Sequence, residues 1–89
     1  MSEAAEQAAK WMLAQIKEHT VLNQHYAAHQ IGQLFGEELV YRNKNRNLAI
    51  SAEVLKIFDK ISGEGVVWQR GTRRWRLRMS HDKPGRQQR

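Results

Sequence analysis

Apolar side chains recur at helical spacing in three segments of the chain. With a rotation of roughly 100° per residue, the apolar positions of residues 2–18, 23–35 and 51–62 each fall on one side of a helix. Asn23 and Ser51 stand at the starts of the second and third segments, where their side chains can cap backbone N–H groups. Gly36 follows the second segment, as glycine does at many helix ends. The pattern predicts three amphipathic helices, whose buried residues are expected to be Ala5, Ala8, Ala9, Met12, Leu13 and Ile16, then Ala27, Ala28, Ile31, Leu34 and Phe35, then Val54, Leu55, Ile57, Phe58 and Ile61.

Residues 66–79 alternate between apolar and polar side chains, as strands do. Gly71-Thr72 suits a two-residue type II′ turn with glycine at positive φ, and this turn would set Trp68 opposite Trp75. One predicted face carries Val66, Trp68, Trp75, Leu77 and Met79, with Arg70 and Arg73 near the tip, and the other carries Val67, Gln69, Arg74, Arg76 and Arg78. We expect the first face to pack on the helices, with the two tryptophans as a core pair in preference to a stacking platform for bases. The second face is nearly an arginine surface.

Two other features leave alternatives open. Residues 20–22 predict a short strand, but residues 37–50 hold two short apolar runs around an asparagine-rich stretch, which suits either a hairpin or a loop. Arg42, Lys44 and Arg46 make that stretch basic, which indicates a solvated loop or, alternatively, a loop that touches phosphate. Trp11 lies on the first helix away from the apolar stripe. It must therefore cover the tail, pack under a loop, or contact a second copy of the chain.

The order of these elements resembles that of a winged-helix domain. The resemblance rests on the capped helix 51–62, the break Gly63-Glu64-Gly65 and the hairpin 66–79, and it covers about residues 4–79. Through residues 34–41, 47–51 and 66–70, the chain also resembles a group of small bacterial winged-helix-type proteins of uncharacterised function. The resemblance implies an α+β fold in which three helices pack on a small antiparallel sheet with a C-terminal hairpin wing. We therefore expect a domain at residues 1–79 and a flexible basic tail at residues 80–89.

The net charge of +6 is concentrated at one end of the chain. Residues 1–62 hold seven Lys and Arg against seven Asp and Glu, whereas residues 63–89 hold eight Lys and Arg against two acidic residues. This asymmetry favours a polyanionic partner, and a solubilising tail is the alternative. Arg74, Arg76 and Arg78 would repeat about every 7 Å along their strand, close to the spacing of successive phosphates.

The resemblance implies DNA binding, with the third helix in the major groove and the wing on the backbone or minor groove. The sequence departs from that pattern in the long connection at residues 37–50 and in the neutral outward face of the third helix, formed by Glu53, Lys56, Asp59 and Lys60. We therefore expect a protein that contacts double-stranded DNA mainly through the basic wing, by the phosphate backbone or the shape of the groove in preference to reading of bases. The candidate residues are Arg70, Arg73, Arg74, Arg76, Arg78, Lys56 and Lys60.

Two other hypotheses fit the same sequence. The protein could be an interaction module that forms a homodimer through Trp11, with no nucleic-acid or catalytic activity. A small adaptor of a mobile element or phage is a third hypothesis.

The 89 residues allow one domain, and the chain has no cysteine. No sequence pattern indicates a catalytic centre, and His25 and His29 have no evident third metal ligand. We expect a protein that is not an enzyme and has no cofactor, metal or small-molecule substrate. The N-terminus does not resemble a signal peptide and no apolar run approaches the roughly 20 residues of a membrane span, so we expect a cytoplasmic protein.

Overall fold

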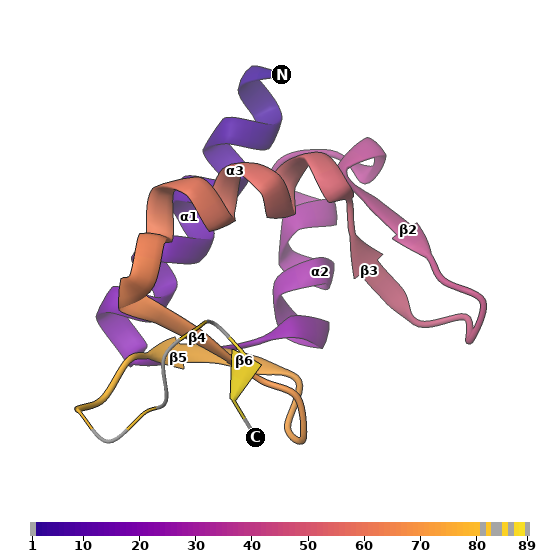
Figure 1. The fold of residues 1–89 in the computed structure, drawn as a ribbon. Helices are drawn as coiled ribbons and strands as arrows, with labels where there is room; N and C mark the ends of the chain where they lie inside the picture. Colours follow the sequence, from indigo (N-terminus) through magenta and orange to yellow (C-terminus); the bar gives the residue numbers. More distant parts are fainter. Residues whose placement is uncertain (1, 81, 83–84, 86, 89) are drawn as a thin grey trace.

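Three helices pack above a small sheet, and a second, two-stranded sheet projects from one side (Figure 1). The computed structural model describes residues 2–80, 82, 85 and 87–88. The helices are α1 (Glu3–His19), α2 (Gln24–Leu34) and α3 (Ala52–Ser62). Each follows a capping side chain, because Ser2, Asn23 and Ser51 accept hydrogen bonds from the backbone N–H groups of Ala5, Tyr26 and Val54. The three predicted helices and the two predicted caps are confirmed.

The main sheet joins strands from both ends of the chain. Its strands are β1 (Val21–Asn23), β4 (Val66–Gln69), β5 (Arg74–Leu77) and β6 (Gln87–Gln88), in the order β1-β5-β4-β6. The first three run antiparallel, and β6 lies parallel to β4. The fold is thus α+β with three helices and a small sheet, but the sheet is mixed, which corrects the prediction of a purely antiparallel one.

The hairpin of β4 and β5 has the predicted register and a different turn. Trp68 lies opposite Trp75 and Gln69 opposite Arg74. Gly71 is not at positive φ; Arg73 is, at 51°, and the turn spans residues 70–73. The predicted type II′ turn is therefore wrong. The Arg70 N–H donates to Gln88 O at 3.0 Å, and Arg73 O accepts from the Gln24 N–H at 3.0 Å, so neither group bonds across the turn.

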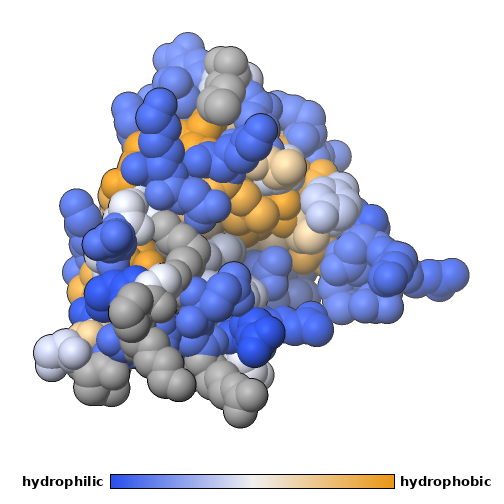
Figure 2. All heavy atoms as spheres, viewed as in Figure 1, coloured by the Kyte–Doolittle hydropathy of each residue, from blue (hydrophilic) through white to orange (hydrophobic). Residues whose placement is uncertain are grey.

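The connection between α2 and α3 is a hairpin, which resolves the alternative left open by the sequence. After a short 3-10 helix, η1 (Glu37–Leu39), strands β2 (Val40–Arg42) and β3 (Leu48–Ile50) pair antiparallel. The hairpin extends away from the rest of the molecule (Figure 1), and its outer part is polar (Figure 2). A side chain at Gly32 would place its Cβ 3.3 Å from Val40 Cγ2, so the glycine inside α2 allows the close approach of β2.

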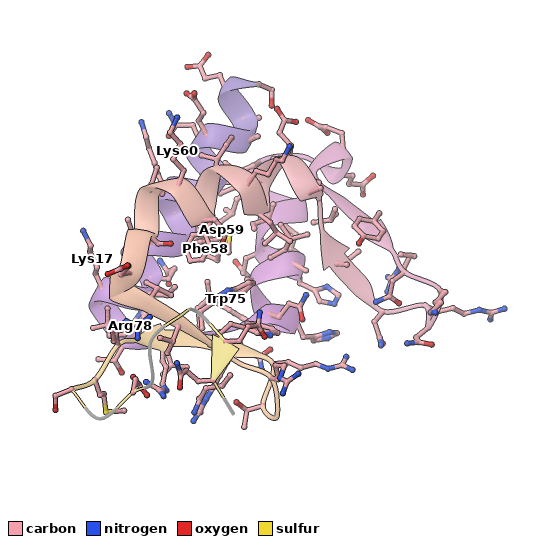
Figure 3. All side chains as sticks on the ribbon, in the orientation of Figure 1. Lys17, Phe58, Asp59, Lys60, Trp75 and Arg78 are labelled. Carbon is pink, nitrogen blue, oxygen red and sulfur yellow. The ribbon has the colours of Figure 1, made fainter. Side chains whose placement is uncertain are left out.

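The core lies between the helices and the main sheet. α1 packs along α3, and Phe58 of α3 meets Trp75 of β5 edge to face, with ring centroids 5.5 Å apart (Figure 3). Trp75 is buried and Trp68 half-buried, with their centroids 4.7 Å apart, so the prediction of a core pair is confirmed. The prediction that Leu34 and Ile61 are buried is wrong: they are 57% and 39% exposed. Leu34 is the last residue of α2, and Ile61 is the last but one of α3.

Candidate nucleic-acid interface

The row of arginines along β5 is present in the predicted register, but it is not a uniformly open surface. Arg74, Arg76 and Arg78 are all half-buried, and Val67 on the same face is fully buried. Arg74 Nε donates to Gln69 Oε1 on β4 at 2.7 Å. The Arg78 guanidinium donates to two backbone carbonyls, those of Glu64 and Gly85. The alternating sequence places the arginines on one face, while residues outside the hairpin cover part of it.

Arg76 makes the strongest of these contacts. Its guanidinium donates two hydrogen bonds to the Asp82 carboxylate, at 2.7 and 2.6 Å, and only 12% and 4% of the two side chains are exposed. The same carboxylate accepts from the Met79 N–H at 2.6 Å. The hydrogen bond to Asp82 raises the pKa of Arg76 above its ordinary value; burial acts in the opposite direction, and the Coulombic attraction of Asp82 adds to the rise. The pair therefore neutralises Arg76 in this conformation.

The described residues of the tail lie against the hairpin. Besides the contacts of Asp82 and Gly85, Gln87 and Gln88 pair with Trp68 and Gln69 of β4. The flexibility expected for residues 80–89 stays a prediction, and Lys83, Arg86 and Arg89 lie outside the described residues. Sequence reasoning missed Asp82. Its one signal is that it is the single acidic residue after Glu64 in a strongly basic segment.

The tip of the β4–β5 hairpin presents its charges to solvent. We call residues 69–74 the wing tip; Arg70 and Arg73 are its exposed arginines, and it contains no acidic residue. The hairpin beneath them is fixed in place because Trp75 is buried against Phe58. These two predicted residues have the accessibility that contact with a polyanion requires.

The predicted lysines of α3 lie apart from the arginines. Lys56 and Lys60 are exposed, and so is Asp59 on the same helix. In Figure 3 Lys60 points away from the sheet, whereas Arg78 lies beside the sheet. Glu53, the fourth residue of that face, accepts a hydrogen bond from the Ser2 N–H at 2.7 Å. The structure therefore does not gather all seven predicted residues into one patch.

A second basic tip lies on the β2–β3 hairpin. Arg42, Lys44 and Arg46 are exposed there. A groove of about 310 Å³ separates this tip from the wing tip, and among the residues that line it are His25, Asn43, Asn47, Thr72 and Arg73. The sequence had suggested phosphate contact for this segment only as an alternative, because a basic loop by itself does not reveal what lies across from it.

Trp11 packs within its own chain. Its ring lies 6.5 Å from that of Tyr26 and 6.4 Å from that of Phe35, both at or near α2. The tryptophan is half-buried, and Tyr26 is 51% exposed. Off the apolar stripe of α1, Trp11 therefore covers α2, and the cluster leaves an aromatic edge in solvent.

The described part of the chain holds neither a cluster of potential metal ligands nor a helix able to span a membrane. There, no three His, Cys, Asp or Glu residues are grouped so that they could hold a metal ion. His25 and His29 do lie together, with ring centroids 4.6 Å apart. Among the described helices, none combines the length and apolar character needed to cross a membrane.

Comparison with known proteins gives one match. A family model described as "Family of unknown function (DUF6953)" matches residues 4–77, which include α1 except for Glu3, α2, α3 and the β4–β5 hairpin. Asp82 and β6 lie outside the matched range. No curated protein and no solved structure matches the chain.

Proposed function

The chain belongs to the family of unknown function DUF6953, and we propose that it is a small winged-helix protein that binds the phosphate backbone of double-stranded DNA. The order α1-β1-α2-α3-β4-β5 supports the winged-helix fold, because the hairpin follows the third helix and shares a sheet with the strand between the first two. The β2–β3 hairpin replaces the short turn of a helix-turn-helix, so α2 and α3 are not joined as in that motif.

The observation that carries the proposal is the pair of exposed arginines at the wing tip. Arg70 and Arg73 stand on a hairpin that Trp75 anchors in the core. A fixed hairpin loses little conformational freedom on binding, and guanidinium groups match phosphate well. On α3, by contrast, Lys56 and Lys60 are accompanied by exposed Asp59, which repels phosphate. Contact with the backbone is therefore favoured over reading of bases.

Binding of the full chain to a random-sequence DNA duplex tests this function. Fluorescence anisotropy between about 50 and about 200 mM salt should show an affinity that falls steeply as salt rises. Arg70→Glu/Arg73→Glu should bind more weakly, with a log–log salt slope smaller by about 1.8, which is about 0.9 for each lost phosphate contact. Lys10→Glu/Lys17→Glu on α1 makes the same change in charge and should bind nearly as the wild type. Absence of wild-type binding at the lowest salt would exclude the proposal.

A homodimer is the second candidate function, and the exposed edge of the Trp11 cluster favours it. Tyr26, which contacts Trp11, is 51% exposed, and Leu34, which precedes Phe35 in the sequence, is 57% exposed. Both lie on α2, and such exposure is high for large apolar side chains. Sedimentation velocity tests it over a range of concentrations. A dimer that Leu34→Glu dissociates would support this candidate, whereas a monomer at every concentration would exclude it.

A further inference from the structure

We infer that the β2–β3 hairpin is a second DNA-binding arm, which holds the phosphate backbone together with the wing tip across the groove between them. We call residues 40–50 the connector arm. The inference rests on the proposed function and adds to it a surface that winged-helix resemblance does not supply, since this hairpin is an insertion between α2 and α3.

The charges of the two arms match in sign and number. The connector arm carries Arg42, Lys44 and Arg46, all exposed, and the wing tip carries Arg70, Arg73 and Arg74. Neither segment contains an acidic residue. Because each arm carries only positive charges, both arms attract an anion toward the groove between them.

The connector arm holds its cations on an ordered turn. The side-chain oxygen of Asn43, Oδ1, accepts hydrogen bonds from the backbone N–H groups of Asn45 and Asn47, at 2.9 and 3.1 Å. The Asn43 N–H donates to Asn47 O at 3.0 Å, and Arg42 Nη1 donates to Arg46 O at 3.3 Å. These bonds are internal to the hairpin, so the Lys44 and Arg46 side chains are not needed to hold its shape.

An arginine occupies a left-handed backbone position in each arm. Arg46 has φ of 62° and Arg73 has φ of 51°. Glycine or asparagine would adopt this conformation at lower cost, and both types stand close by, as Asn45, Asn47 and Gly71. Backbone strain retained at an exposed, charged side chain is typical of a position that serves binding. Arg46 and Arg73 are the charged residues among the three non-glycine residues at positive φ in the described part of the chain; the third, Thr20, ends α1.

The groove between the arms suits a sugar-phosphate backbone. Its lining includes the polar side chains of Gln24, His25, Asn47 and Thr72, and no acidic residue is among the described residues that line it. Amide, imidazole and hydroxyl groups all donate hydrogen bonds to phosphate oxygens. A strand of a DNA duplex that lay along the groove would thus meet neutral donors from α2 and the connector arm and the Arg73 guanidinium from the wing tip.

Charge reversal on each arm separates this inference from the proposed function. Lys44→Glu/Arg46→Glu and Arg70→Glu/Arg73→Glu would be compared with the wild type in the duplex titration, with Lys10→Glu/Lys17→Glu as the control. Each arm variant should lower the salt slope by about 1.8. A connector variant that binds as the wild type, beside a wing variant that binds weakly, would overturn the second arm and leave the proposed function intact. Absence of DNA binding by the wild type at the lowest salt would overturn both the second arm and the proposed function.

Glycine substitution tests the role of the left-handed arginines without reversing a charge. Arg46→Gly should leave the melting temperature unchanged or higher, because the strain is relieved, and should lower the salt slope by about 0.9. Thr20→Gly is the matched control, since Thr20 is also left-handed, at φ of 71°, and carries no charge. Thr20→Gly should also have an unchanged or higher melting temperature, and it should bind DNA with the affinity and salt slope of the wild type. A lower melting temperature for Arg46→Gly with unchanged DNA binding would show a purely structural arginine and overturn the inference.

Discussion

At the scale of the residue, Trp75 joins the basic hairpin to the helical core. It is buried, meets Phe58 edge to face and lies beside Trp68. We expect Trp75→Ala to lower the free energy of unfolding by about 3–5 kcal/mol, because it removes a large apolar surface and leaves a cavity. Urea denaturation followed by circular dichroism measures this loss. Met79→Ala is the control. Met79 is 48% exposed, two residues after β5, and its replacement should change the free energy of unfolding by no more than about 0.5 kcal/mol.

Asp82 is the second residue whose contribution can be isolated. Asp82→Asn should lower the free energy of unfolding by roughly 1–3 kcal/mol, because Arg76 keeps its charge and loses a charged acceptor. Glu64→Gln removes the same charge from an exposed side chain and is the matched control. A variant as stable as the wild type would contradict a stabilising ion pair.

The pH dependence of this pair follows from Arg76. Its pKa is raised, so the stability that the guanidinium contributes is fully present below the ordinary pKa of arginine and is lost only as pH rises through the higher folded-state pKa. The difference in unfolding free energy between the wild type and Asp82→Asn should therefore stay constant between about pH 6 and about pH 9. Urea titrations at both ends of that range would reveal any change.

At the scale of the element, Gly36 separates α2 from the connector. Its φ is 125°, and a Cβ there would lie 2.5 Å from the Glu38 carboxylate oxygens. The carboxylate can move, so the backbone conformation decides the cost, and Gly36→Ala should destabilise the fold by about 1–3 kcal/mol. Gly65→Ala is the control, because a Cβ at Gly65 meets nothing within 4 Å. Equal melting temperatures for the two variants would contradict this account.

Elements whose signals are local could be predicted from the sequence. The helices follow from apolar period and capping residues, and the pairing of Trp68 with Trp75 follows from a turn centred on Gly71-Thr72. The type of the turn at Gly71 could not be predicted, because its two ends bond to other elements. The Arg70 N–H donates to Gln88 O in β6, and Arg73 O accepts from the Gln24 N–H at the start of α2. The groove could not be predicted for the same reason: its two sides lie in different hairpins.

At the scale of the whole molecule, the tail completes the sheet. β6 pairs with β4, Asp82 binds Arg76, and Gly85 accepts from Arg78. Without residues 80–89 the edge of β4 would present unpaired backbone groups, and such edges associate with other strands. We expect a chain of residues 1–79 to be less stable and to self-associate as its concentration rises. Sedimentation velocity beside the full chain measures this, and a stable monomer of residues 1–79 would contradict it.

The pairing of β1 with β5 has a consequence for the time course of folding. Val21 lies opposite Arg76, so the first strand of the main sheet has no neighbour until most of the chain is available. α1 and α2 depend on local bonds and can form early, whereas closure of the sheet brings together residues far apart in sequence, which is slow. During synthesis from the N-terminus, β1 must wait for β5. We therefore expect the domain to reach its native state only after synthesis of the hairpin is complete.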